Sequence, residues 1–294
     1  MDVTLKKNSK EALKGNWGTA CAFLLIILGL FASFQMLQGA VETIFDFSSK
    51  ADIPFNIFNL PTLLQNPDFV IPMISILVFA ILQFFSFVPM TFGYTTLFFH
   101  IVEGKSVETA QIFSYFSSFK LYLKTIWMTV NLLARSLFWA IILLMPGLLS
   151  LLISSQISSN YSLSSNQTAT MIATVLGFLG IPLLVIGILF LAVILQKYFL
   201  ARYIFIQDNT KKVTDCIRFS ILMMKGNKKD VLFFRLSFIG WILLIPITLF
   251  VGSLYVMPYQ SASFAAYARS IIISKFYEFH QSRMQETLQE GIHP

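Results

Sequence analysis

The side chains best suited to bind a metal or to transfer a proton are few in this sequence. It contains three histidines, His100, His280 and His293, and two cysteines, Cys21 and Cys216. No histidine has a second histidine or a cysteine at the spacing typical of zinc or haem ligands. We therefore expect no metal site and no cofactor, with His100 at the end of an apolar helix and the other two in a polar tail.

The sequence also lacks the charged groups on which most intramembrane chemistry depends. No aspartate or glutamate lies deep in an apolar stretch, although proton-coupled pumps and intramembrane aspartyl enzymes usually need one. Lys225-Gly-Asn-Lys-Lys229 has too few glycines, and no following serine or threonine, for a phosphate-binding loop. The sequence offers no candidate for a buried general base that could activate a serine nucleophile. These patterns predict that the protein is not an enzyme and has no catalytic residues.

Uncharged polar side chains inside the apolar stretches are the next candidates. Gln83 is the most interior and could line a substrate path. We favour a hydrogen bond across a helix interface, which contributes roughly 0.6–2 kcal/mol. The other members of this set are Gln35, Ser86, Thr91, Thr95, Thr96, Asn131 and Gln196.

A cluster of basic residues is the best binding candidate. Each lysine or arginine near an anionic membrane surface contributes roughly 1 kcal/mol to binding, so the cluster predicts contacts with lipid headgroups. An ordinary basic loop on the inner side of a membrane would explain the same charges equally well. The cluster consists of Lys211, Lys212, Arg218, Lys225, Lys228 and Lys229.

The composition of the chain indicates the kind of protein that must position these residues. Of its 294 residues 56% are hydrophobic and only 12% are charged, whereas soluble domains are about one quarter charged. This excludes an ordinary soluble domain, and two distant cysteines exclude a disulfide scaffold. The composition predicts an all-α fold, a polytopic bundle of membrane helices.

The spans follow from the stretches that lack charge. A helix needs about 20 apolar residues to cross the bilayer, and a charge at its centre is costly. We divide the longest uncharged stretch at its polar segment 154–168, and we read the last one as a hairpin that turns at 252–258. A polar cytoplasmic tail, 276–294, follows a single membrane domain, 1–275. The six predicted spans are 17–37, 70–99, 136–153, 169–196, 236–256 and 258–275.

The distribution of charge predicts the orientation. The expected external segments 39–69, 154–168 and 252–258 hold one basic residue, Lys50, so 20 of the 21 lysines and arginines fall on the other side. Positive charge marks the cytoplasmic side, which places both termini in the cytoplasm and the protein in a plasma membrane. The net charge of +7 is then an orientation signal and does not indicate nucleic-acid binding.

Short amphipathic cytoplasmic helices are predicted at 4–14, 106–124 and 211–225, each ahead of an odd-numbered span. In the last of them, apolar residues occupy one side at helical spacing, and Gly226 suits its C-terminal cap. The tripeptide Lys-Gly-Asn closes both the first and the third helix, at 14–16 and 225–227. The apolar set is Val213, Cys216, Ile217, Ile221 and Met224.

Spans three and five also resemble each other. Arg135 precedes Pro146 by 11 residues, and Arg235 precedes Pro246 by 11. We interpret the chain as three units, each an amphipathic helix followed by a transmembrane hairpin, although inner loops of membrane proteins are commonly basic and amphipathic. A proline frees a backbone carbonyl in a membrane helix, so Pro146, Pro182 and Pro246 are candidate hinges.

Several blocks spread over the chain carry a family resemblance. The opening Lys10-Glu-Ala-Leu-Lys-Gly-Asn-Trp-Gly18 resembles the start of the bacterial integral membrane proteins catalogued as domain of unknown function 975. The resemblance implies a plasma membrane and carries no catalytic residues. The long segment Gly39–Asp68 and the tail after Lys275 depart from the family pattern. The other matching blocks are Pro89-Met-Thr-Phe-Gly-Tyr94, Glu103-Gly-Lys105, Met223-Met-Lys-Gly-Asn227, Leu236-Ser-Phe-Ile-Gly-Trp241, Met257-Pro-Tyr259 and Ala265-Ala-Tyr267.

Three functions remain open from the sequence. The first is a non-enzymatic membrane scaffold, regulator or envelope component that contacts lipids, among them anionic ones, or another membrane protein. The second is a transporter or lipid-handling conduit with proline-containing helices around an apolar cavity. The third is protection against membrane-active peptides, which would require the external segments to meet the peptide.

Overall fold

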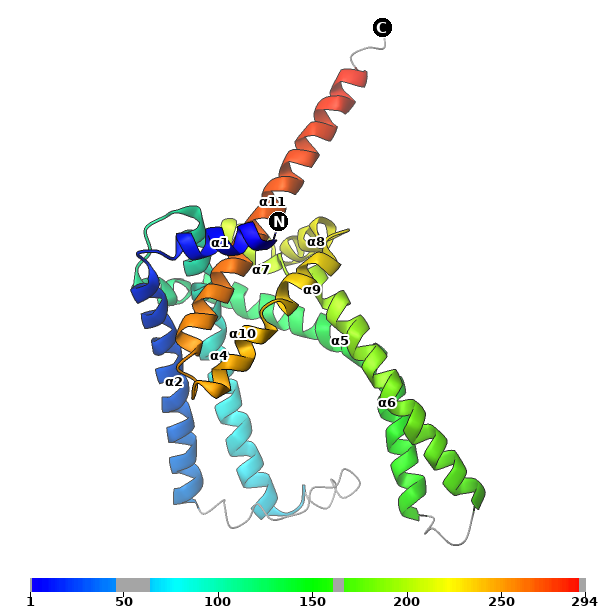
Figure 1. The fold of residues 1–294 in the computed structure, drawn as a ribbon. Helices are drawn as coiled ribbons and strands as arrows, with labels where there is room; N and C mark the ends of the chain where they lie inside the picture. Colours follow the sequence, from blue (N-terminus) through cyan, green and yellow to red (C-terminus); the bar gives the residue numbers. More distant parts are fainter. Residues whose placement is uncertain (1, 46–63, 161–166, 291–294) are drawn as a thin grey trace. The chain divides into compact units, whose positions relative to one another are not determined.

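The computed structural model describes residues 2–45, 64–160 and 167–290, and this part of the chain is almost wholly helical (Figure 1). Much of the predicted external segment 39–69, the middle of 154–168, and the tail residues 291–294 with His293 lie outside the described residues. The chain forms two compact units. Unit 1 comprises Met1–Asp2, Trp127–Ile247 and Tyr267–Pro294, and unit 2 comprises Val3–Ile126 and Thr248–Ala266.

Unit 2 begins with helices α1 (Asp2–Ala12), α2 (Trp17–Ile44) and α4 (Pro67–Glu103), followed by the 3-10 helix η3 (Thr109–Phe116). η3 packs closely on α4 at Gly93, where a Cβ atom would lie 2.8 Å from the Cα of Ile112. Only glycine permits that approach. The side-chain oxygens of Thr96 and Tyr115 lie 2.9 Å apart in a hydrogen bond between the same two elements. The fully buried side chains of this core include Phe23, Phe92, Phe98, Phe99 and Ile112.

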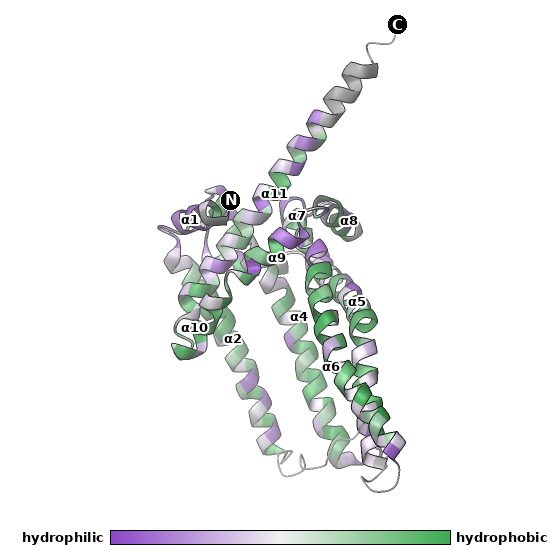
Figure 2. Cartoon of the chain, turned by 45° about the vertical axis from the view of Figure 1, so that its right-hand side comes forward, coloured by the Kyte–Doolittle hydropathy of each residue, from purple (hydrophilic) through white to green (hydrophobic). Residues whose placement is uncertain are grey.

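Unit 1 is built on a hairpin of α5 (Phe119–Asn160) and α6 (Gln167–Leu195), which lie side by side and are hydrophobic over most of their length (Figure 2). Two serines of α5 donate hydrogen bonds across the hairpin, from Ser150 Oγ to the carbonyl of Leu176 at 2.5 Å and from Ser154 Oγ to that of Ala173 at 2.7 Å. Small residues allow the two backbones to approach this closely, as is common between membrane helices.

The rest of unit 1 continues from the end of α6. It contains η4 (Gln196–Tyr198), α7 (Ala201–Gln207), α8 (Val213–Met223), α9 (Lys228–Leu236) and α10 (Ile239–Ile247), and α11 (Ser253–Glu290) enters the unit at Tyr267. The 3-10 helix η4 joins α6 to α7, and α7, α8 and α9 gather at that end of the hairpin (Figures 1 and 2).

Five helices of the described residues are long and apolar enough to cross a membrane: Trp17–Ile44, Phe69–Glu103, Phe119–Ser159, Gln167–Gln207 and Lys228–Ile247. The first four contain the four spans predicted from residue 17 to residue 196. Each helix extends past the predicted span, because a helix continues beyond the hydrocarbon core while its backbone remains hydrogen-bonded.

The fifth predicted span, 236–256, and the turn predicted at 252–258 are misplaced. The apolar helix ends at Ile247, directly after Pro246, and the chain turns through Thr248–Gly252. Leu249 and Phe250 adopt positive φ angles of 48° and 66° there, a strained conformation for large side chains. Thr248 Oγ1 accepts a hydrogen bond from the Gly252 N–H at 2.9 Å, which fixes this turn.

Pro258 does not turn the chain, and its helix has a contact that compensates for the proline. Pro258 lies inside α11 and has no N–H, so the carbonyl of Leu254, four residues earlier, has no helical donor. Cys21 Sγ of α2 donates to that carbonyl at 3.4 Å. The neighbouring rings of Trp17 and Tyr255 stack with centroids 5.1 Å apart. α2 therefore stabilises the start of α11 despite its proline.

The predicted sixth span, 258–275, lies within α11, which is not among the five apolar helices. α11 is rich in alanine and serine where the other spans carry leucine and phenylalanine. Between residues 262 and 268 its side chains are mostly buried, including Ala262, Ser263, Ala265 and Ala268 at 0% exposure. The helix continues through the predicted tail as far as Glu290.

The predicted helix 106–124 is wrong, because the segment is divided. η3 ends at Phe116, and α5 begins at Phe119 after two serines. Serine hydroxyls compete for backbone hydrogen bonds, as Ser117 Oγ does by donating to the Ser114 carbonyl at 2.7 Å. α1 (Asp2–Ala12) overlaps the helix predicted at 4–14, and α8 (Val213–Met223) lies within the one predicted at 211–225.

The two Lys-Gly-Asn tripeptides have the same local structure. Gly15 and Gly226 have φ angles of +86° and +90°, and a new helix starts directly after Asn16 and after Asn227. Buried residues also recur around the two tripeptides. In each pair the two residues are separated in the sequence by as many positions as Gly15 and Gly226. The matching buried pairs are Ser9 and Ser220, Leu13 and Met224, Ala20 and Val231, and Phe23 and Phe234.

Candidate functional site

Helix α8, which is flanked by basic residues on both sides in the sequence, turns its apolar side into the protein. Val213, Cys216, Ile217 and Met224 are buried and Ile221 is half-buried, as the sequence pattern predicts. The apolar side is therefore occupied by the protein's own packing. Of the six predicted basic residues, Lys228 is half-buried, and the exposed ones are Lys211, Lys212, Arg218, Lys225 and Lys229.

Two large apolar side chains remain exposed among these charges. Phe219 and Leu222 of α8 are 44% and 54% exposed. The segment 208–230 contains six basic and three acidic residues, which gives a net charge of +3. We refer to the six basic residues together with Phe219 and Leu222 as the α8–α9 surface. It combines cations with apolar groups, as membrane-surface helices do.

The loop before α8 is fixed by Asp208. Its Oδ1 atom accepts hydrogen bonds from the N–H of Thr210 at 3.0 Å and from the Thr210 hydroxyl at 2.5 Å. The bonds from Thr210 hold the pKa of the Asp208 carboxyl below its usual value, with a smaller contribution from Lys211. Asp208 thereby remains charged and positions Lys211, whose Nζ lies 3.5 Å from Asp208 Oδ2.

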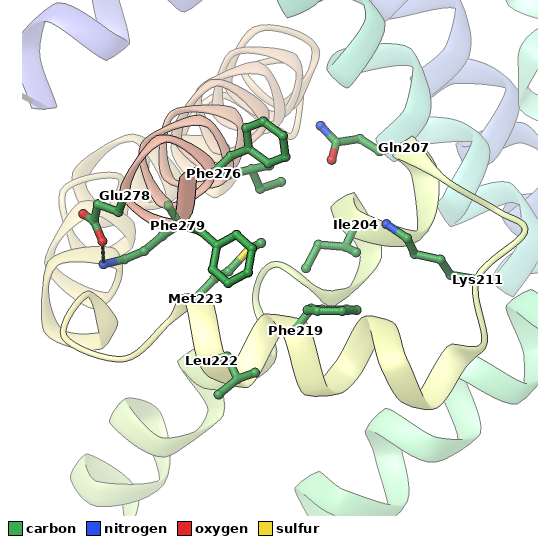
Figure 3. Close-up of a pocket in the computed structure, with 11 residues that line it drawn as sticks. Ile204, Gln207, Lys211, Phe219, Leu222, Met223, Phe276, Glu278 and Phe279 are labelled. Atoms are coloured by element: carbon green, nitrogen blue, oxygen red, sulfur yellow. Dashed lines mark hydrogen bonds and ion pairs between the residues drawn. The ribbon is translucent and has the colours of Figure 1, made fainter. Parts of the chain in front are cut away.

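A pocket of about 760 Å³ lies between α7, α8 and α11 within unit 1 (Figure 3). Its walls are mainly apolar. Lys211 extends toward its centre from the loop after α7, and Lys275 and Glu278 lie on α11, joined by a 2.6 Å ion pair. Gln207 adds an amide at the end of α7. The apolar lining includes Ile204, Phe219, Leu222, Met223, Ile272, Phe276 and Phe279.

The structure brings only part of the predicted site to this pocket. Lys211 lines it, but the other five basic residues are not among its lining residues. Sequence reasoning missed Gln207 at the end of α7, and it missed Lys275 and Phe276 because α11 was interpreted as a span followed by a tail. Lys275 followed by Phe276 and Phe279 near the end of an apolar segment was the available signal.

The structure shows where the three candidate hinge prolines lie and which hydrogen bonds the predicted uncharged polar residues make. Pro146 and Pro182 lie inside the continuous helices α5 and α6, and Pro246 lies one residue before the end of α10. Thr91, Thr95 and Asn131 donate to carbonyls of their own helices, and Gln196 of η4 donates to the Ala192 carbonyl of α6. Thr96 also bonds across to Tyr115, whereas Ser150 and Ser154, which the sequence did not single out, make the bonds between α5 and α6.

His100 lies in the last turn of α4, as expected. Across the described residues no three histidine, cysteine, aspartate or glutamate side chains gather where they could hold a metal ion. The arrangement at α7, α8 and α11 offers cations and apolar walls, which suit binding of an amphipathic anion.

The five apolar helices define a multi-pass helical membrane protein. A family model described as "Protein of unknown function (DUF975)" matches residues 1–275, so the chain belongs to this family and the resemblance seen in the sequence is confirmed. No curated protein matched the chain. No solved structure matched it either.

Proposed function

We propose that this protein is a non-enzymatic scaffold or regulator in a bacterial plasma membrane that acts by binding anionic lipid headgroups through the α8–α9 surface. The exposed cations beside Phe219 and Leu222 carry the proposal. Cations attract anionic headgroups while apolar side chains enter the interface, so the two contributions add. Another membrane protein with an anionic juxtamembrane segment is the alternative partner.

The proposal includes six spans with both termini in the cytoplasm. α11 supplies the sixth crossing at 258–275, and the turn Thr248–Gly252 lies outside. The exposed apolar tip of that turn, Leu249, Phe250 and Val251, favours contact with the outer lipid boundary. The positive-inside distribution of lysine and arginine supports the same orientation.

Single-cysteine labelling tests this topology. Cys21 and Cys216 are first replaced by serine, and one cysteine is then introduced at residue 156, 212 or 249. We expect an impermeant maleimide to label positions 156 and 249 from outside the cell and position 212 only after permeabilisation. Labelling of 156 and 212 from the same side would reject the topology.

Lipid selectivity tests the proposed activity. The detergent-purified full chain is titrated with phosphatidylglycerol and with phosphatidylcholine of the same acyl chains. Replacing all six basic residues with glutamine should abolish the preference for the anionic lipid, a change of at least about tenfold, since each cation near an anionic surface contributes roughly 1 kcal/mol. A matched variant with the five lysines changed to arginine keeps the charge and should keep the preference. An unchanged preference in the glutamine variant would refute the proposal.

A further inference from the structure

We propose that the pocket between α7, α8 and α11 binds one acyl chain of an anionic membrane phospholipid whose phosphate is held by Lys211. This inference rests on the proposed function and names the ligand and the residues that select it. The α8–α9 surface would then attract anionic headgroups in general, while the pocket holds a single lipid molecule.

The walls of the pocket suit a hydrocarbon chain. Its volume of about 760 Å³ lies within the range of about 300–1,000 Å³ typical of small-molecule sites. Phe276 and Phe279 are 58% and 57% exposed on α11, and Phe219 faces the pocket from α8 (Figure 3). Three phenylalanine rings around one hollow expose apolar surface that an acyl chain would cover, which is favourable by the hydrophobic effect.

The cation at one side of the pocket suits a phosphate. Lys211 Nζ lies 5.8 Å from the ring centroid of Phe219, so the charge lies directly beside the apolar wall. Lys211 pairs with Asp208 over 3.5 Å. An exposed ion pair of this kind contributes little to stability, so the Lys211 ammonium is able to turn to a phosphate, which accepts charge-assisted hydrogen bonds. The amide of Gln207 lies on the same side as Lys211, whereas Glu278, which pairs with Lys275, lies across the pocket (Figure 3).

The location of the pocket favours a membrane lipid over a soluble ligand. The apolar helical stretch Gln167–Gln207 contains two of the lining residues, Ile204 and Gln207, at its last turn. That stretch already carries Lys197 and Arg202, the first charged residues after the span predicted at 169–196. The pocket therefore lies a few residues past the point where the apolar span gives way to charge, on the headgroup side of the bilayer. A phospholipid needs only to place one chain in the pocket while the other stays in the bilayer.

The test uses the full chain in a neutral detergent and counts bound lipids by native mass spectrometry. The probes are phosphatidylglycerol, phosphatidylcholine with the same acyl chains, and glycerol phosphate, which has no chains. We expect one tightly bound phosphatidylglycerol, with phosphatidylcholine bound about tenfold more weakly and no retained glycerol phosphate. Met223→Trp fills the pocket and should remove the tight site, and Lys211→Gln should remove its preference for the anionic lipid. Lys7→Gln, an exposed lysine of α1 outside both the pocket and the α8–α9 surface, should leave it unchanged.

A second measurement does not depend on a variant that fills the pocket. Phe276→Trp exchanges one aromatic ring for another at an exposed position, and its fluorescence should be quenched by phosphatidylglycerol with bromine on one acyl chain. The wild-type protein gives the background from its four tryptophans. No quenching beyond that background, or a tight site unaffected by Met223→Trp, overturns the pocket proposal. If the anionic preference persists in these variants but disappears in the six-glutamine variant, the proposed function stands and only the pocket assignment fails.

Discussion

The phenolic hydroxyl of Tyr122 donates a hydrogen bond to the backbone carbonyl of Phe85 over 3.1 Å. Phe85 lies four residues before Pro89 in α4, so its carbonyl has no N–H partner in its own helix. The bond from Cys21 to Leu254, four residues before Pro258, follows the same rule. In both places a side chain from another helix satisfies an acceptor that a proline has freed, as the interior of a membrane protein requires.

Tyr122→Phe removes this donor and should destabilise the protein by about 1–2 kcal/mol, because a carbonyl left without a donor in a water-poor setting is costly. Unfolding of the detergent-purified protein by increasing sodium dodecyl sulfate measures the change. In a Pro89→Ala background the alanine supplies a backbone N–H that satisfies the Phe85 carbonyl, and the cost of Tyr122→Phe should fall by at least half. Equal costs in the two backgrounds would show that the bond has another role.

Gly147 of α5 provides a steric prediction. A Cβ atom there would lie 2.7 Å from Leu184 Cγ and 2.8 Å from its backbone nitrogen. Gly147→Ala should therefore destabilise the α5–α6 hairpin by about 1–3 kcal/mol through overpacking. Gly29→Ala is the matched control, because that helical glycine faces open space, and it should stabilise by roughly 0.5–1 kcal/mol. Thermal unfolding in detergent distinguishes the two signs.

Gly226 closes α8 with a φ angle of +90°. An L-residue side chain is strained there, so Gly226→Ala should cost about 1–2 kcal/mol, and Gly226→Asn less, since asparagine tolerates the left-handed region better. Gly15→Ala, at +86° in the first Lys-Gly-Asn tripeptide, should give a matching cost. Sodium dodecyl sulfate unfolding measures all three variants. If Gly226→Ala proved neutral, this account of the helix end would be wrong.

Cys216 provides a prediction about pH. Burial raises the pKa of its thiol, so the folded state favours the neutral form. The associated stability is present below the unfolded pKa, near 8.5, and is lost as the pH rises through the higher folded value. In a Cys21→Ser protein, N-ethylmaleimide should modify native Cys216 at pH 8 at least about 100-fold more slowly than the unfolded chain. Mass spectrometry over time measures both rates, and similar rates would contradict the burial of this residue.

The sequence predicted the apolar helices well for a physical reason. The cost of burying charge in lipid is large, so the uncharged stretches around residues 17–37 and 70–99 had to be helical. Turns are decided by smaller energies. The chain turns after Pro246, whereas Pro258 lies inside α11, where Cys21, far away in sequence, donates to the carbonyl that Pro258 frees.

The candidate site was only partly predictable. The apolar residues of α8 recur at helical spacing, so the burial of that side, and the exposure of Arg218 on the other side, could be inferred from the pattern alone. Lys211 and Lys275 line the same pocket although they lie far apart in the sequence, so no local pattern could predict that they share it. The serines that link α5 to α6 could not be predicted either. The roles of Ser150 and Ser154 depend on the carbonyls of Leu176 and Ala173, which only the folded hairpin brings opposite them.

Helix α11 shows what a residue-by-residue hydropathy scale overlooks. Its alanines and serines between 262 and 268 have little affinity for lipid, yet several of them are completely enclosed. Exchanging Ala265 for leucine would make the segment score as a better bilayer helix while making it fit its surroundings worse. In membrane proteins of this kind, segments of intermediate hydropathy that keep small side chains are candidates for helices that pack closely against their neighbours.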